Sequence, residues 1–344
     1  MSFSVGIVGL PNVGKSTLFK ALTKNKVDIA PYPFTTIRPN VGVVHVPDER
    51  LEKIAEILNP EKTTPTIIEF VDIAGLVKGA HKGEGLGNQF LAQIRNCDAI
   101  LEVVRGFDNQ KTENVLGEVN PEKEMEIIKT ELLMKDLETL EGLIQGAESD
   151  SKKDKKFLKK LELLKRIKEG VSEGKSVSEI NLTDEEKAEI KEYQFLTQKP
   201  TLYILNVGNE TDHANFKFAY LGMNLKEEEE MSELSESETK ELGLKSQIDQ
   251  LILNCYNVLD LVTFFTVAGL KETRAWTIKK GGTAPEAGGV VHTDFKEKFI
   301  RAEAILWNKL VESKGWKTAK ELGWLKIHGK DYIVQDGDVI EFKI

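Results

Sequence analysis

Cysteine is scarce in this 344-residue sequence, which contains only Cys97 and Cys255. Neither has a second cysteine or a histidine nearby at the spacing of a metal site, so the sequence indicates neither a disulfide framework nor a zinc site. We therefore expect both cysteines to be small buried residues.

Long apolar runs and an excess of positive charge are also absent. No run approaches the roughly 18 apolar residues of a membrane-spanning helix. The first predicted strand begins within four residues of Met1, so we expect no signal peptide. The formal net charge of −9 argues against general affinity for nucleic acids. We expect a cytoplasmic protein in which any RNA contact comes from a local basic patch.

The remaining composition is that of a globular protein, with 40% hydrophobic and 30% charged residues. The length allows two or three domains. Residues 1–121 and 197–276 alternate predicted strands and helices, so we expect them to form one α/β domain. Residues 122–196 are helical in pattern and predict an inserted antiparallel hairpin, while residues 277–344 predict a small α+β domain suited to binding.

The predicted hairpin combines an apolar stripe with a basic segment. The stripe includes Leu132 and Leu140 on one helix and Leu161 and Leu164 on the other. Between 152 and 168 lie nine Lys or Arg residues against two acidic ones. Two interpretations of this segment stay open: a solvated helix face, or a patch that contacts RNA phosphates.

The most specific pattern lies near the N-terminus, where residues 4–9 predict a buried strand. A Gly-x-x-x-x-Gly-Lys-Ser motif follows and runs directly into a helical pattern, which is the context that a phosphate-binding loop requires. Gly9 and Gly14 allow successive N–H groups to converge on phosphate oxygens. Lys15 is expected to reach the β- and γ-phosphates, and the Ser16 hydroxyl to ligate Mg²⁺. The sequence therefore predicts a nucleotide phosphate site.

Two later segments have the order expected of nucleotide switches. The Pro-rich loop 31–37 contains threonines that could supply a second Mg²⁺ ligand. A β-branched strand then ends in Asp72, placed to hold Mg²⁺ through water, and Gly75 follows with an N–H for the γ-phosphate. The Gly-rich segment 78–88 is predicted to be the second switch.

The strand at 201–206 predicts the base-binding end of the site. In GTPases of this fold that strand ends in Asn-Lys-x-Asp, whose aspartate accepts hydrogen bonds from guanine. Here it continues Asn206-Val207-Gly208-Asn209-Glu210, and an asparagine offers guanine no carboxylate. Without that acceptor the site loses its discrimination for guanine, so ATP is the expected nucleotide.

No obvious residue orients the attacking water. The position that holds a water-orienting glutamine in many GTPases is Leu76, which cannot hydrogen-bond to water. Asn12 has two open roles: coordination of K⁺ that bridges the phosphates, or stabilisation of a turn. His81 lies in the second predicted switch, where an exposed and uninvolved side chain is the simpler interpretation. Hydrolysis is therefore expected to be slow.

Taken together, these motifs resemble the YchF subfamily of Obg-like ATPases, which are P-loop proteins with an OBG-type G domain. The likeness covers nearly the whole chain. The residues that carry it are Gly9–Thr17, Tyr32–Ile37, Pro47–Arg50, Asp72–Gly79, Lys82–Asn88, Arg274–Ile278, His292–Phe295, Phe299–Ala302 and Asp336–Asp338.

The resemblance implies a fold, an activity and a set of site residues. The fold is an α/β P-loop NTPase (GTPase-like) domain with an inserted antiparallel helical hairpin and a C-terminal ubiquitin-like α+β TGS domain. The activity is ATP hydrolysis, with ATP preferred over GTP and with ribosome association through the hairpin and the TGS domain. The implied nucleotide contacts are Asn12, Val13, Gly14, Lys15, Ser16, Thr17 and Val207, to which the strand end adds Asn206. The candidate metal ligands are Ser16, Thr36 and Asp72, and the candidate catalytic residues are Lys15, Asn12 and Gly75.

Three features of the sequence depart from the family pattern. The usual base motif is Asn-x-x-Glu, whereas Glu210 comes one place late here. The segment between 207 and 234 is about a dozen residues shorter than in relatives. Several relatives carry a histidine before the hairpin that is proposed to assist hydrolysis, and the matching residue here is Asn114, which cannot act as a general base near neutral pH.

The sequence thus predicts a slow Mg²⁺-dependent ATPase, with K⁺ as a second candidate cofactor, that acts as a nucleotide-gated switch in translation or stress regulation. Its expected partners are ATP, the ribosome and regulatory proteins, with no membrane. Two alternatives stay open. One is a GTPase of the same fold. The other is an ATP-sensing scaffold with negligible hydrolysis that regulates a protein partner.

Overall fold

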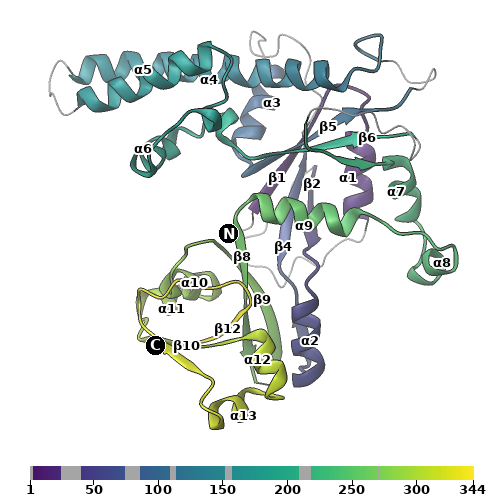
Figure 1. Cartoon of the computed structure of the whole chain (residues 1–344), viewed down its shortest axis with the longest axis vertical. Helices are drawn as coiled ribbons and strands as arrows, with labels where there is room; N and C mark the ends of the chain where they lie inside the picture. The colour runs from purple at the N-terminus through teal and green to yellow at the C-terminus, as the bar shows by residue number, and fades with distance from the viewer. Residues whose placement is uncertain are drawn as a thin grey trace.

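The computed structural model describes residues 3–24, 40–73, 86–108, 114–151, 157–208, 218–269 and 271–344. These residues build two six-stranded sheets and a long helical hairpin (Figure 1). Within the described ranges no helix combines the length and apolar character needed to cross a membrane.

The first sheet has the strand order β2-β4-β1-β5-β6-β7. All neighbours are parallel except β2 and β4, which are antiparallel. The central strand β1 pairs Val5 with Phe70 on one side and with Ala99 on the other. Every residue of β5 is buried, as expected for a parallel strand covered on both faces. The strands are β1 (Phe3–Val8), β2 (Val41–His45), β4 (Ile67–Asp72), β5 (Ala99–Arg105), β6 (Thr201–Asn206) and β7 (Leu221–Met223).

Helices α1 (Lys15–Thr23), α3 (Leu86–Arg95) and α9 (Ile248–Val258) bury apolar side chains against this sheet. Leu18 of α1, Ile94 of α3 and Cys255 of α9 are each 0% exposed in the shared core. Cys97 is buried as well, so both cysteines have the expected buried positions. The acidic segment after β7 forms two short helices, α7 (Leu225–Met231) and α8 (Glu236–Glu241).

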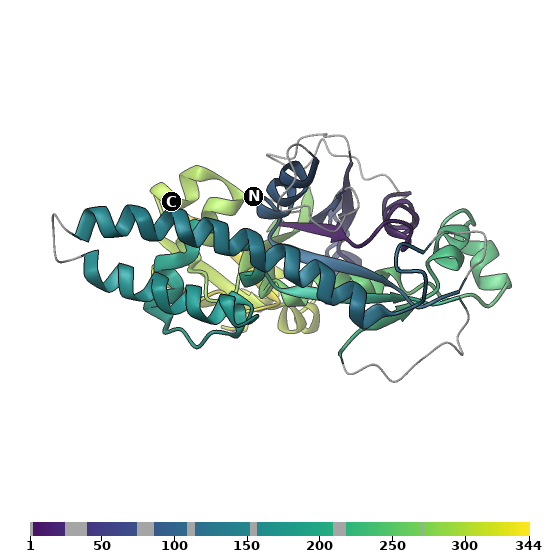
Figure 2. The same cartoon turned by 90° about the horizontal axis from the view of Figure 1, so that it is seen from above.

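The predicted hairpin consists of α4 (Pro121–Ser151) and α5 (Leu158–Ser172), and it projects beyond the sheet in Figures 1 and 2. The first half of α4 packs on the sheet through Ile128 and Leu132. Its second half packs with α5 in a separate core that includes Leu140 and Leu164. The return to the sheet runs through three one-turn 3₁₀ helices and α6, namely η3 (Val177–Glu179), α6 (Asp184–Ile190), η4 (Lys191–Tyr193) and η5 (Leu196–Gln198).

The second sheet has the order β11-β10-β12-β8-β9-β3 and supports four short helices. Its strands are β3 (Lys62–Thr64), β8 (Leu261–Ala268), β9 (Glu272–Lys279), β10 (Arg301–Leu306), β11 (Lys326–His328) and β12 (Asp338–Lys343). Its helices are α10 (Ala284–Val291), α11 (Thr293–Glu297), α12 (Trp307–Glu312) and α13 (Trp316–Glu321). Because β8 and β9 pair along their whole length, the C-terminal sheet starts at Leu261, and the expected boundary at 276/277 falls inside β9.

A part of the N-terminal chain belongs to this second sheet. Helix α2 (Glu49–Leu58) buries Leu51 and Ile54 in one core with Phe265 and Ile305. Strand β3 adds to the edge of β9 in parallel, with Lys62 opposite Glu272. Figure 1 shows α2 beside β9 and α12, well below the strands that precede and follow it. The two sheets are therefore interlocked by residues 49–64.

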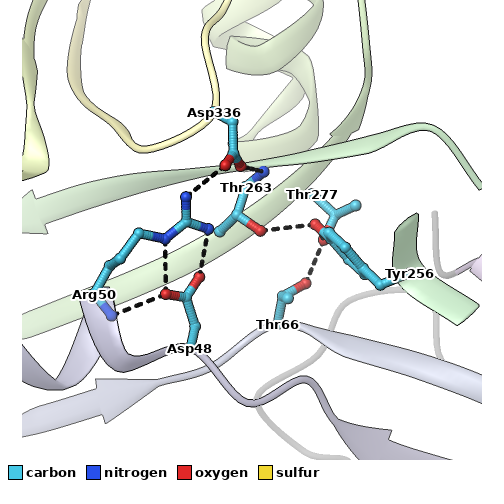
Figure 3. A network of polar contacts seen from close by, with 7 residues as sticks. All are labelled: Asp48, Arg50, Thr66, Tyr256, Thr263, Thr277 and Asp336. Atoms are coloured by element: carbon cyan, nitrogen blue, oxygen red, sulfur yellow. Dashed lines mark hydrogen bonds and ion pairs between the residues drawn. The ribbon is translucent and has the colours of Figure 1, made fainter. Parts of the chain in front are cut away.

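Polar contacts reinforce this connection (Figure 3). The Tyr256 hydroxyl on α9 donates to the Thr277 hydroxyl at 2.9 Å and shares a hydrogen bond of 2.8 Å with Thr263. Thr66, just before β4, lies 2.5 Å from the Thr277 hydroxyl. All four side chains are buried, so each hydroxyl has a partner in place of water.

Candidate functional site

The phosphate loop connects β1 to α1 with a backbone that requires glycine at two points. Gly9 has φ 155° and Gly14 has φ 110°, both in the range that side chains disfavour. A Cβ on Gly14 would lie 2.5 Å from Nδ2 of Asn206. Helix α1 begins directly after Gly14, and the first N–H groups of a helix are suited to bind phosphate oxygens.

Lys15 folds back across the loop. Its Nζ donates to the backbone oxygens of Leu10 at 2.7 Å and Gly9 at 3.1 Å, and the residue is 8% exposed. Burial lowers the pKa of Lys15 to about 8, although the charges of Asp72 and Glu124 act in the opposite direction. An anion that reached this ammonium would meet a poorly hydrated positive charge.

Ser16 and Asp72 meet at the end of β4. The Ser16 side chain is hydrogen-bonded to the Asp72 carboxylate, which lowers the pKa of Asp72, while burial, the larger effect, raises it above its usual value. The hydroxyl and the carboxylate together form a small oxygen-only donor set, which suits Mg²⁺. Within the described residues no group of three or more His, Cys, Asp or Glu side chains is arranged to hold a metal.

Asn206, at the end of β6, holds the phosphate loop in place through hydrogen bonds of its side chain. Its Nδ2 donates to the backbone oxygen of Val13 at 2.9 Å, and its Oδ1 accepts from the N–H of Leu225 at 3.2 Å. The residue is 7% exposed. The amide therefore links the phosphate loop to α7 and fixes the position of Gly14.

These residues line one cleft of about 880 Å³, close to the size of pockets that hold nucleotide-sized ligands. Of the predicted site residues, Asn12, Gly14, Lys15, Ser16, Thr17, Asn206 and Val207 line it. Val13 is buried behind the loop and contributes its backbone to the contact with Asn206. Asp72 reaches the cleft through Ser16.

The cleft also contains residues that the sequence did not single out. Phe107 and Asp108 follow β5, and Asn224 follows β7. Their position after parallel strands, where ligands bind in α/β sheets, was a signal that could have identified them. Nδ2 of Asn224 donates to the Gly208 oxygen at 3.0 Å, which fixes the loop after β6. The Arg105 guanidinium lies over the Phe107 ring, with 4.5 Å between the guanidinium carbon and the ring centre.

A buried carboxyl group lies close enough to Lys15 for the two charges to interact. Glu124, in the first turn of α4, accepts a hydrogen bond from the Arg105 N–H at 2.9 Å and is 2% exposed. Burial raises the pKa of Glu124 to about 7, with Arg105 and Lys15 opposing the shift. Glu102 of β5 is also buried, and its burial together with the Glu124 charge raises its pKa well above the usual value.

Several predicted positions lie outside the described residues. They are Thr36, Gly75, Leu76, His81, Asn209, Glu210, Lys152, Lys153, Lys155 and Lys156. Asn114 is described, and its amide is engaged in its own loop. It donates to the Glu118 oxygen at 2.6 Å and accepts from the Leu116 N–H at 2.9 Å.

The parallel sheet, the glycine-dependent loop and the buried lysine at the start of α1 define a P-loop nucleotide-binding protein. The family model described as "50S ribosome-binding GTPase" matches residues 4–135. The model named YchF-GTPase_C, "protein of unknown function (DUF933)", matches residues 261–344.

Relatives identify the family more narrowly. The chain is 46% identical to the ribosome-binding ATPase YchF of Bacillus subtilis and 47% identical to that of Haemophilus ducreyi, over 100% of this chain and 99% of each relative. The solved Schizosaccharomyces pombe YchF GTPase superposes with a TM-score of 0.86 at 33% identity, covering 99% of this chain and 98% of that one. The chain belongs to the YchF family.

This membership confirms the fold predicted from the sequence: a P-loop domain, an inserted helical hairpin and a C-terminal TGS-like domain.

Proposed function

We propose that the protein is a cytoplasmic, Mg²⁺-dependent ATPase that associates with the ribosome and acts as a nucleotide-gated switch. One observation carries the proposal: the phosphate loop, Lys15 and the Ser16–Asp72 pair share one cleft with Asn206 and Val207. The name ribosome-binding ATPase, which the bacterial relatives carry, supports both the reaction and the partner.

Lys15 is proposed to bind the β- and γ-phosphates. Its ammonium now donates to two backbone oxygens, and phosphate oxygens would take their place as stronger, charged acceptors. Exchange of a neutral acceptor for an anionic one favours the protonated lysine, so nucleotide binding is expected to raise the lowered pKa of Lys15.

Ser16 and Asp72 are proposed to hold Mg²⁺, directly through the hydroxyl and through water for the carboxylate, with Thr36 as a further ligand. When bound, the metal would neutralise the negative charge that develops on the phosphates. Asn12 lines the cleft with an exposed side chain and is the proposed K⁺ contact. Gly75 is proposed to offer its N–H to the γ-phosphate.

Slow turnover is proposed for two reasons. The side chain of Leu76 cannot hydrogen-bond to the attacking water, and the Asn114 amide is occupied by its own loop. A K⁺-dependent rate would support the Asn12 assignment.

The base is proposed to be adenine. Val207, Gly208 and Asn224 line the end of the cleft next to β6 and β7, and Phe107 offers an aromatic ring. Among the described lining residues near this strand end, the amide of Asn224 is already bonded to the Gly208 oxygen and the Glu227 carboxylate. Backbone groups are therefore the proposed readers of the base edge.

The test compares ATP turnover of the parent protein with Lys15→Ala, with and without purified ribosomes and K⁺. Lys20→Ala is the matched control, because Lys20 lies on the same helix with a side chain that is 70% exposed and pairs with Glu229. We expect slow ATP hydrolysis that Lys15→Ala abolishes and Lys20→Ala retains. Turnover no higher than that of Lys15→Ala under every condition would overturn the enzyme assignment.

Ribosome association is tested separately by co-sedimentation at increasing salt. Contacts through the lysines of the hairpin predict binding that weakens with salt. Neutralising Lys152, Lys153, Lys155 and Lys156 together should reduce it if this segment contacts RNA. Unchanged co-sedimentation would assign these lysines to a solvated surface.

A GTPase activity is the second candidate, because the solved Schizosaccharomyces pombe relative is named a GTPase. Equilibrium binding of fluorescent ATP and GTP analogues separates the two. A tenfold preference, about 1.4 kcal/mol, for either nucleotide decides between them.

A further inference from the structure

A second cavity lies in the C-terminal domain, on the part of the second sheet formed by β10, β11 and β12. It has a volume of about 520 Å³, within the range of ligand pockets. In Figure 1 the neighbouring helices α12 and α13 lie at the end of the molecule away from the hairpin. None of the residues lining this cavity lines the nucleotide cleft.

The small side chain of Ala304 in β10 contributes to the lining of the cavity. Ala304 pairs with Lys326 of β11, which lines the same cavity. Trp324 lines one part of the cavity, and His328 and Tyr332 line another. These three rings are only half-buried, so part of each ring remains open to a ligand.

The rings are held in place. The His328 and Tyr332 rings stack with 3.7 Å between their centres and 20° between their planes. The Tyr332 hydroxyl donates to the buried Asp338 carboxylate at 2.7 Å. Burial lowers the pKa of His328, which favours the neutral form of the stacked imidazole. A planar ligand would therefore meet an ordered aromatic surface.

Two lysines also line the cavity. Nζ of Lys309 lies 4.8 Å from the centre of the Trp324 ring and pairs with Glu312 at 2.7 Å. Lys326 is exposed and forms no ion pair with any residue that the structure describes. Aromatic rings beside cationic side chains are the combination that binds the bases and phosphates of single-stranded nucleic acid.

The charge of the surrounding segment favours the same ligand. Residues 261–344 hold 14 Lys and Arg against 11 Asp and Glu, a positive balance in a chain whose net charge is −9. Between 309 and 330 the balance is six lysines against two glutamates. This segment carries α12, α13 and β11, which border the cavity.

We propose that this cavity binds one unpaired nucleotide of RNA, with the base against Trp324 and the His328–Tyr332 stack and the phosphates near Lys309 and Lys326. The inference rests on the proposed association with the ribosome and names the RNA feature that the C-terminal domain would take. Duplex RNA keeps its bases stacked inside the helix, so it should not enter the cavity.

The test measures binding of a fluorescein-labelled single-stranded oligoribonucleotide of about ten nucleotides to the full-length protein by anisotropy. His328→Ala removes one ring and should weaken binding about fivefold or more. Ile327→Ala is its matched control, because Ile327 is the neighbouring residue on the other face of β11 and is 68% exposed. It should bind like the parent protein.

Lys326→Gln should lower the slope of log affinity against log salt by about 0.7, the value for one phosphate contact on a single strand. Lys296→Gln, an exposed lysine of α11 outside the cavity, should leave the slope unchanged. Thermal unfolding and fluorescent ATP binding check that each variant is folded and that its nucleotide site is intact.

Equal binding by His328→Ala and Ile327→Ala would overturn the proposal. So would equal binding of the single strand and its duplex. A poly-glutamate peptide serves as a probe for an acidic protein partner. If the peptide binds the parent protein and binds His328→Ala more weakly, while RNA binds both proteins equally, the ligand of the cavity is an acidic protein and not RNA. Failure here leaves ATP turnover and salt-sensitive co-sedimentation through the hairpin untouched, so the two proposals fail separately.

Discussion

Arg50 of α2 donates a hydrogen bond of 2.6 Å to Asp336, which lies 286 residues further along the chain. The same guanidinium donates to both oxygens of Asp48, at 2.8 and 2.9 Å (Figure 3). Asp336 in turn accepts from the N–H of Thr263 in β8 at 2.9 Å. One side chain thus joins the N-terminus of α2 to a loop and a strand of the C-terminal sheet.

Removing this arginine is expected to destabilise the connection between the sheets. Arg50→Gln leaves the Asp48 carboxylate, whose side chain is 7% exposed, with fewer donors and should cost about 1–3 kcal/mol of unfolding free energy. Asp336→Asn keeps an acceptor for Thr263 and has a side chain that is 53% exposed, so its cost should be about 1 kcal/mol or less. Urea unfolding of both variants and of the double variant measures the coupling, and strict additivity would contradict a direct interaction.

Gly14→Ala should abolish nucleotide binding. The new Cβ would lie 2.5 Å from Nδ2 of Asn206 in a backbone conformation with φ 110°, so the loop must move away from β6. Gly146→Ala is the control, because it lies within α4 with no atom near its Cβ position and should stabilise the helix by about 0.5–1 kcal/mol. Binding of a fluorescent ATP analogue measures the first effect, and thermal unfolding measures the second. Retained ATP binding in Gly14→Ala would show that this loop geometry is not required.

Asn206→Asp should weaken nucleotide binding more than its small change in shape suggests. The aspartate keeps an acceptor for the Leu225 N–H but replaces the donor to the Val13 oxygen with a second acceptor. Two acceptors would then face each other in a buried place, at a cost of about 1–3 kcal/mol. We expect roughly a tenfold or greater loss of ATP affinity, measured with a fluorescent analogue. Asn206→Ala removes both contacts without the repulsion, and a tighter-binding aspartate than alanine would argue against this account.

Glu124 predicts a pH dependence of stability. Its pKa of about 7 in the folded protein exceeds the ordinary value of 4.5, so the folded state holds this proton more tightly than the unfolded state. The stability that it contributes is therefore present below about pH 4.5 and is lost as the pH rises toward 7. The loss amounts to about 3 kcal/mol at most.

Glu124→Gln keeps an oxygen for the Arg105 N–H but does not titrate. Urea unfolding midpoints between pH 5 and 8 should fall for the parent protein and stay flatter for this variant. Parallel curves for the two proteins would show that Glu124 does not determine how stability changes between pH 5 and 8.

The sequence predicted the first strand and the phosphate loop well because both depend on local chemistry. The buried strand before Gly9, the two glycines and the helix after them have few other conformations available. The hairpin was equally clear, since the apolar residues between Met125 and Ile144 in α4 recur at helical spacing.

What the sequence did not indicate depends on distant contacts. Nothing in Lys62–Thr64 shows that these residues pair with β9 across a separation of 210 residues. Phe107 and Asn224 come together in the cleft only because β5, β6 and β7 are neighbours in the sheet. The expected C-terminal boundary at 276/277 lies inside β9 because only the pairing of β8 with β9 assigns both strands to the second sheet, and the sequence does not show that pairing.

The interlocked segment has a consequence for how the protein is made. Strand β3 leaves the ribosome about 200 residues before its partner β9, which at about 5–20 residues per second corresponds to roughly 10–40 s. During that interval α2 has no Phe265 or Ile305 to cover Leu51 and Ile54. Leu51 and Ile54 therefore stay uncovered until translation is nearly finished. The N-terminal part of the chain can complete its folding only after the C-terminal sheet has been synthesised.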